Sequence, residues 1–248
     1  MAKGDLASGS SPIVSALNVR VQKVVSEVGR VEYEGDKDPY KGLSPEDKQK
    51  GKQLAAAWIK MDKAAECKTI LQQRSIYLVG LPAIGIEQIG SLIARRFENY
   101  RYLNMNDVIA SASGQGEVES SKELISKMGE EAFREVEEAV LDQLQALLRS
   151  VISTDAGVVL RPSNWGKMNQ GIVVYVEADI DKLAAQQSIW SKEELQDIQA
   201  RCSEMFKQAD VKVKIDVGNA ADNIAVSIIE SMTRELKRSK RGSGSASP

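Results

Sequence analysis

The sequence of 248 residues contains no histidine. This absence excludes Ser-His-Asp triads, Cys-His dyads and zinc sites with histidine ligands. Aromatic residues make up only 5% of the chain, which argues against extensive platforms for stacking nucleic-acid bases. Thirty-three Lys and Arg residues face 35 Asp and Glu residues, a formal net charge of -2. We therefore expect neither a nucleic-acid partner nor an acidic disordered chain.

Cysteine and long apolar runs are also scarce. Cys67 and Cys202 are too few for a four-cysteine zinc site, and we favour two buried thiols, with a single disulfide as the alternative. The longest apolar run, around Ile172–Val176, is far too short to span a membrane. Residues Met1–Asp5 include no apolar segment of a secretory signal and are too short and acidic for a complete transit peptide. If the protein is organellar, we expect its targeting segment to be absent from this chain.

The amino-terminal part of the chain is expected to be an extension, residues 1–73, with a short strand near residues 21–28. Ser44 followed by Pro45 and two acidic residues predicts the start of an amphipathic helix over residues 45–72. Helical spacing places these apolar side chains on one face: Leu54, Trp58, Met61 and Ala65. This face either packs on the main domain or binds a partner.

From residue 74 the chain alternates between short apolar runs and amphipathic segments. We expect strands over 75–80, 100–103, 150–154, 171–177 and 211–217. We expect the main helices after the loop at residue 85, from residue 121, and over 130–148, 192–207 and 220–237. This alternation predicts one α/β domain, residues 74–237, with a parallel sheet covered on both faces. Residues 238–248 are expected to be a disordered tail.

The loop after the first of these strands lies where nucleotide enzymes hold phosphate. Gly80 and Gly85 have the spacing of the motif G-x-x-x-x-G-K-[ST], but Ile86 replaces its lysine and Glu87 its hydroxyl residue. Two unit charges about 4 Å apart interact with an energy of roughly 4 kcal/mol at an effective dielectric of 20. The negative charge of Glu87 should therefore repel a phosphate. Its carboxylate also lies where it can cap the helix that follows. We interpret the loop as an emptied phosphate site; an ordinary strand-to-helix turn is the alternative.

Residues 77–237 resemble the shikimate kinase family in five blocks that keep the family's order and spacing. The blocks are LVGLPAIGIEQIG (78–90), YLNMNDVI (102–109), GEEAFREVEEAVL (129–141), STDAGVVLRP (153–162) and VVYVEA (173–178). This resemblance implies a P-loop kinase-like three-layer sandwich with a five-stranded parallel sheet.

The chain departs from this family at the catalytic positions. Asn104 and Asn106 stand where the family has aspartates, and asparagine is neither a general base nor a good Mg²⁺ ligand. Of three glycines that line the family's shikimate pocket, only Gly157 remains. The family's lid arginine has no counterpart, because no arginine lies between residues 161 and 201. Together with the altered loop, these departures predict a catalytically inactive protein without metal or cofactor.

Other pocket positions are retained. Phe133 and Arg134 match positions of the family's shikimate pocket, and Arg201 matches a carboxylate-binding arginine less securely. With Gly157 these residues form a candidate residual carboxylate pocket, since paired arginines hold carboxylates well. The alternative is that Phe133 belongs to the core and the arginines are solvated or ion-paired. Asp155 is placed to pair with Arg134 and close the old pocket.

The chain most resembles the plant chloroplast shikimate kinase-like proteins with altered sites. This resemblance implies location in the chloroplast stroma, a non-catalytic protein-binding or scaffold role in chloroplast biogenesis, and no binding of ATP or shikimate. The unknown partner would contact the extension, the face of Leu54, Trp58 and Met61, or the segment around Trp190. Two alternatives stay open: a sensor of small carboxylates that uses Arg134 and Arg201, and a phosphotransferase with an altered substrate.

Overall fold

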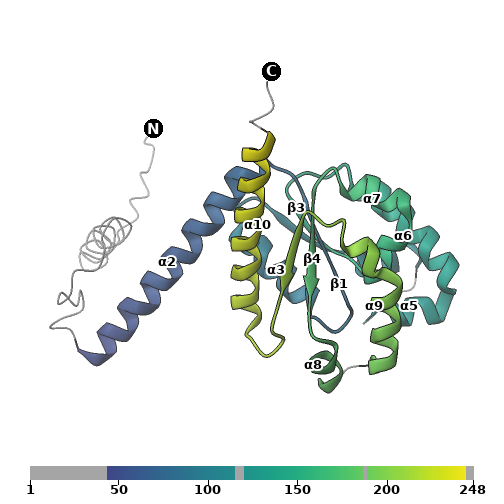
Figure 1. The fold of residues 1–248 in the computed structure, drawn as a ribbon, viewed down its shortest axis with the longest axis horizontal. Coiled ribbons are helices and arrows are strands. Elements are labelled where there is room, and N and C mark those ends of the chain that lie inside the picture. The colour runs from purple at the N-terminus through teal and green to yellow at the C-terminus, as the bar shows by residue number, and fades with distance from the viewer. Residues whose placement is uncertain (1–43, 115–119, 187–188, 244–248) are drawn as a thin grey trace, which may run out of the picture. The chain divides into compact units, whose positions relative to one another are not determined.

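The computed structural model describes residues 44–114, 120–186 and 189–243 (Figure 1). The strand expected near residues 21–28 lies outside this part of the chain. Two compact units, Met1–Met61 and Asp62–Pro248, divide the protein. The boundary between these units falls inside the first described helix, and the domain start expected at residue 74 stays a prediction. The end of this helix is buried in the core of the second unit, through Ala64, Cys67 and Leu71.

Five parallel strands form one sheet in the order β2-β3-β1-β4-β5. The strands are β1 (Ile76–Gly80), β2 (Arg101–Asn104), β3 (Ser150–Ser153), β4 (Ile172–Glu177) and β5 (Val211–Lys214). Each lies within one residue of its expected start, so the predicted α/β class and five-stranded parallel sheet are confirmed. The central strands β1, β3 and β4 are buried almost throughout, as a sheet covered on both faces requires.

The expected long helices are α2 (Pro45–Leu71), α3 (Ile86–Arg96), α5 (Ser121–Met128), α6 (Glu130–Leu144), α9 (Lys192–Phe206) and α10 (Ala221–Ser243). Short elements add to them: α4 (Met105–Ala112), the 3-10 helix η1 (Ala156–Leu160), α7 (Pro162–Met168) and α8 (Ile180–Ala185). Helix α10 continues beyond residue 237 into the tail expected to be disordered. None of the helices in the described ranges is long and apolar enough to cross a membrane.

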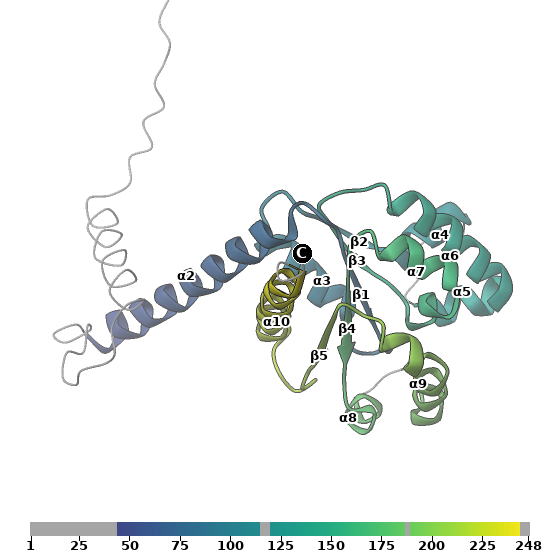
Figure 2. The ribbon, with the colours of Figure 1, turned by 45° about the horizontal axis from the view of Figure 1, so that its top comes forward.

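Helices cover the sheet on both faces (Figures 1 and 2). Helices α3 and α10 lie on one side, and α4 to α7 with α9 lie on the other. The side chains of β1 alternate between the cores on the two faces of the sheet. Ile76 and Leu78 pack into the core with α3 and α10, and Tyr77 and Val79 pack into the core with α4, α6 and α7. This three-layer arrangement directs the loops after β1, β2 and β3 to one edge of the sheet.

The two cysteines belong to different cores. Cys67 packs in the α3 and α10 core and Cys202 in the opposite one, and both thiols are free and buried. Burial raises the pKa of each thiol to about 11. The expectation of two buried thiols is confirmed, and the sheet between them excludes the alternative disulfide.

Candidate active site

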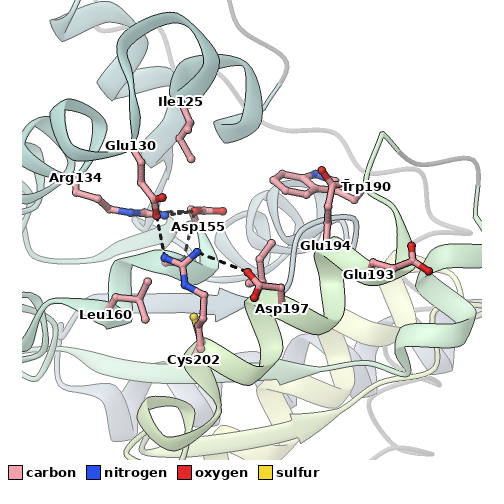
Figure 3. Close-up of a pocket in the computed structure, with 13 residues that line it drawn as sticks. Ile125, Glu130, Arg134, Asp155, Leu160, Trp190, Glu193, Glu194, Asp197 and Cys202 are labelled. Carbon is pink, nitrogen blue, oxygen red and sulfur yellow. Dashed lines mark hydrogen bonds and ion pairs between the residues drawn. The ribbon is translucent and has the colours of Figure 1, made fainter.

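Two cavities open at the carboxyl ends of the strands. The first, which we call the loop cavity, measures about 290 Å³ and is bounded by residues 80–87. The second, the arginine cavity, measures about 440 Å³ and is lined by Arg134 and Arg201 (Figure 3). Asp155 and Trp190 line both. Two compartments that share walls suit a site with two ligands.

The loop cavity depends on two glycines. A Cβ on Gly80 would lie 2.7 Å from the Val176 carbonyl oxygen, so a larger residue would push the loop away from β4. Gly85 precedes α3 with a φ of 77°, a left-handed conformation that glycine adopts without strain. Ile86 turns into the core and is only 4% exposed.

Glu87 does not cap α3 as expected. Its side chain is exposed, and no described residue hydrogen-bonds its carboxylate. A carboxylate that points to water leaves the start of α3 open to the cavity. The prediction of a self-capped phosphate loop is therefore wrong in this respect.

The two asparagines after β2 have different surroundings. Asn104 Oδ1 accepts a hydrogen bond from the backbone N–H of Asn106 at 3.1 Å and caps α4. Asn106 lines the loop cavity, and its buried Oδ1 has no partner among the described residues. Asn104 thus serves the fold, whereas Asn106 has a buried acceptor without a described partner beside the loop cavity.

Asp155 lies at the junction of the two cavities. Its Oδ1 accepts a hydrogen bond from Ser121 Oγ at 3.0 Å, and its Oδ2 accepts one from the Gly157 backbone N–H at 3.4 Å. The guanidinium of Arg134 lies 3.5 Å from Oδ2. The pairing of Asp155 with Arg134, raised from the sequence, is present.

Arg134 is buried and already engaged. Its Nη1 donates to both carboxylate oxygens of Glu137, at 2.9 and 3.0 Å. Gly157 makes room for the guanidinium, since a Cβ there would lie 2.0 Å from Nη2. Burial by itself would lower the pKa of Arg134, but the charges of Glu137 and Asp155 outweigh it and hold the pKa above its usual value. The guanidinium is therefore not free to hold a ligand carboxylate.

The other two retained positions, Arg201 and Phe133, do not share one pocket. Arg201 of α9 lies between Glu130, at 2.9 Å, and Asp197, at 3.8 Å. The hydrogen bond from Arg201 lowers the pKa of the Glu130 carboxyl. Phe133 is fully buried and packs in the core, away from both cavity linings. The alternative, a core phenylalanine and ion-paired arginines, is what the structure contains.

Sequence reasoning missed two charged residues of this site. Glu137 lies one helical turn after Arg134 on α6, a spacing that predicts the contact. Lys122 Nζ donates to the Ile189 carbonyl oxygen at 3.0 Å and to Glu194 at 2.7 Å, and it lies 5.0 Å from the Trp190 ring centroid. No sequence pattern predicts the contact with Glu194, because it joins two helices, α5 and α9, that are distant in the chain.

The expected partner-binding face on α2 stays a prediction. Leu54, Trp58 and Met61 belong to α2, but their side chains lie outside the described residues. Within the described ranges, no three His, Cys, Asp or Glu side chains gather where they could hold a metal ion.

Comparisons with known proteins converge on one family. The sequence model described as shikimate kinase matches residues 84–233. A shikimate kinase from Nostoc punctiforme is 30% identical over 179 residues, covering 68% of this chain and 96% of the relative. One from Synechococcus elongatus is 28% identical over 181 residues, covering 69% and 93%.

Solved structures agree on the fold. Shikimate kinase from Acinetobacter baumannii, solved with shikimate, has a TM-score of 0.58 and 21% identity over 71% of this chain and 98% of its own. The enzyme from Bacteroides thetaiotaomicron has a TM-score of 0.52 and 22% identity over 68% and 98%. The predicted P-loop kinase-like fold is confirmed.

These findings correct the expected function. We predicted a catalytically inactive protein from the substitutions at Ile86, Glu87, Asn104 and Asn106. The expected scaffold role in chloroplast biogenesis came from the resemblance to plant proteins alone. The matching relatives are shikimate kinases along nearly their whole length, and they point to an enzyme. With a family model that covers more than half of the sequence and relatives matched almost end to end, the chain belongs to the shikimate kinase family.

Proposed function

We propose that this protein is a small-molecule phosphotransferase. It transfers a phosphoryl group from a nucleoside triphosphate in the loop cavity to a hydroxyl group of an acceptor in the arginine cavity. The observation that carries this proposal is the shared wall of the two cavities, formed by Asp155 and Trp190. Family membership supports the reaction class, since the relatives are named as kinases.

The donor side relies on the start of α3. Helix N-termini attract phosphate through free backbone N–H groups and the helix dipole. Because Glu87 is exposed, water and salt weaken its repulsion of the phosphates. The loop itself provides no lysine. We infer that Lys122 supplies the missing positive charge, since its Nζ already contacts the carbonyl oxygen of Ile189 at the wall of the loop cavity.

The acceptor side relies on Asp155. In the proposed step an acceptor hydroxyl oxygen forms a bond to the γ-phosphorus, and the bond between that phosphorus and the β,γ-bridging oxygen breaks. The nucleoside diphosphate leaves, and the hydroxyl proton passes to the Asp155 carboxylate. A carboxylate that orients the hydroxyl and takes its proton is the usual base in such transfers.

Nucleotide kinases also use Mg²⁺, which neutralises charge on the phosphates. Of the side chains that line the loop cavity, Glu87 offers an exposed carboxylate for it, and the buried Oδ1 of Asn106 is the weaker ligand. These two residues would hold the ion together with phosphate oxygens.

The test is a coupled assay of ADP release by the whole chain with ATP–Mg²⁺ and a panel of hydroxylated acceptors that includes shikimate. We expect acceptor-dependent ADP release. Asp155→Asn should lower kcat by about 10² or more, and Lys122→Met should lower kcat/KM for ATP. Lys207→Met is the matched control, because Lys207 pairs with Glu204 outside both cavities. No release above the enzyme-free rate with any acceptor would overturn the proposal. Calorimetric titration with ATP–Mg²⁺ should show binding, in contrast to the expectation from the sequence that neither ATP nor shikimate binds; no heat of ATP binding would also contradict the proposal.

We also infer that this protein belongs to the plastid branch of its family and works in the chloroplast stroma. The support is that the matched relatives include several cyanobacterial enzymes, the lineage from which plastids descend. A fluorescent fusion of the full gene product should overlap with a stromal marker. A signal confined to the cytosol would contradict this inference.

A stromal protein partner that binds α2 remains a proposal. The apolar spacing of Leu54, Trp58 and Met61 supports it. Trp58→Ala should abolish capture of that partner from stroma while the melting temperature stays unchanged. Capture of the same proteins by the variant would contradict it.

A further inference from the structure

The arginine cavity has an excess of negative charge. Its lining includes five carboxylates and two guanidiniums: Glu130, Asp155, Glu193, Glu194 and Asp197 against Arg134 and Arg201. Glu137 adds a further carboxyl group directly behind Arg134. A cavity of this composition attracts a positive group and repels a negative one.

Both guanidiniums of the lining already have two carboxylates each. Arg134 contacts Glu137 and Asp155, and Arg201 contacts Glu130 and Asp197. Lys122, which is outside the cavity lining, likewise donates to Glu194 of that lining. A ligand carboxylate would have to displace one of these partners or lie beside them. Neither arrangement gains a free positive charge.

Asp155 places a negative charge next to Arg134 in the lining of the cavity. Its side chain is only 11% exposed, and Ser121 and the Gly157 backbone hold it in place. Arg134 itself is more than nine-tenths buried and keeps one donor, Nε, without a partner among the described residues. An uncharged ligand oxygen beside Arg134 at the cavity wall would add no negative charge to the cluster.

We infer that the arginine cavity selects a hydroxylated ligand that carries a positive charge, such as an amino alcohol, over the corresponding carboxylate, and that Asp155 sets this preference. The inference rests on the proposed function in taking this cavity as the acceptor site. It names the acceptor class as an amine and not an acid.

The test compares three probes that share one ring and its hydroxyl groups: shikimate, its carboxamide and its aminomethyl counterpart. Binding is measured by calorimetry at low salt, where charge preferences are least screened. We expect the wild-type protein to bind the aminomethyl probe at least about tenfold more tightly than shikimate, with the carboxamide between them. Asp155→Asn, which keeps the shape of the side chain, should narrow this gap by about tenfold.

Asp181→Asn is the matched control, since Asp181 pairs with Lys192 outside both cavity linings. Asp155→Gly is a second variant, and thermal melting of both Asp155 variants verifies that they fold. Shikimate binding as tightly as the amine, an unchanged gap in Asp155→Asn, or no binding of any probe would overturn the inference. ADP release is measured on the same samples. Tighter binding of the amine without ADP release would contradict the proposed function alone. ADP release with tighter binding of the carboxylate would contradict this inference alone.

Discussion

Glu137 is the most unusual titratable residue near the site. It is fully buried on α6, and both of its oxygens accept hydrogen bonds from Arg134. Burial raises the pKa of its carboxyl group to about 7, because the attraction of Arg134 does not fully offset the loss of hydration. The folded protein therefore holds a proton that the unfolded chain releases near pH 4.5.

This raised pKa predicts how stability depends on pH. Glu137 contributes stability that is fully present below about pH 4.5 and is lost as pH rises through about 7. The melting temperature should fall between pH 5 and 8, a window in which no histidine of this sequence titrates. Hydrogen bonds from Ser163 and Arg161 lower the pKa of Glu138 to about 2, so that group is ionised throughout the window.

Glu137→Gln should remove this slope, even though the variant itself is less stable because Arg134 loses a charged partner. Glu204→Gln is the control, because Glu204 is exposed and pairs with Lys207 on the surface of α9. The measurement is a series of thermal melts from pH 5 to pH 8. Equal slopes for the wild type and Glu137→Gln would refute the assignment.

Within single helices, two glycines make opposite predictions. Gly166 lies exposed in α7, and a Cβ there would meet no atom within 4 Å. Gly90 lies buried in α3, and a Cβ there would lie 2.8 Å from the Tyr102 ring and 3.2 Å from a Leu78 methyl carbon. Alanine suits both helices by propensity, so the difference comes from packing alone.

Gly166→Ala should stabilise the protein by about 0.5–1 kcal/mol, because alanine loses less backbone entropy in a helix. Gly90→Ala should destabilise it by about 1–3 kcal/mol, because the added methyl group overpacks α3 against β1 and β2. Urea unfolding of the two variants measures both free energies. Shifts of the same sign would show that helix propensity outweighs packing at Gly90.

At the scale of the whole molecule, the end of α2 is part of the folded unit. Leu71 is fully buried in the core beneath β1, and ion pairs link α2 to α10 through Lys63 with Glu230 and Glu66 with Lys237. Exposed ion pairs add little to stability, so buried side chains carry this attachment.

Leu71→Ala should therefore cost about 2–5 kcal/mol of unfolding free energy. Leu148→Ala is the matched control: Leu148 is 62% exposed, and a surface change of this kind typically stays within about 0.5 kcal/mol. Chemical denaturation compares the two variants. A small effect of Leu71→Ala would place the start of the domain after α2, as the sequence suggested.

The sequence by itself determined the strands and the long helices. Their signals are local: β1 is an unbroken apolar run, and a capping box of Ser191 and Glu194 begins α9. The helices α4, α7 and α8 escaped prediction because each has at most eight residues and a weak periodic pattern, although α5, which is no longer than α4, was predicted. The burial of Leu71 could not be predicted, because it depends on residues distant in the chain.

Only the tertiary structure decided the site. The substitutions at Ile86 and Glu87 are plain in the sequence, but they do not reveal that Glu87 leaves the start of α3 uncapped or that Lys122 reaches the same edge from α5. Nor do they reveal that Asp155 joins two cavities. A motif reports the groups within one loop, whereas the charge at a site is the sum over every element that converges there. That sum depends on distances that the fold alone sets.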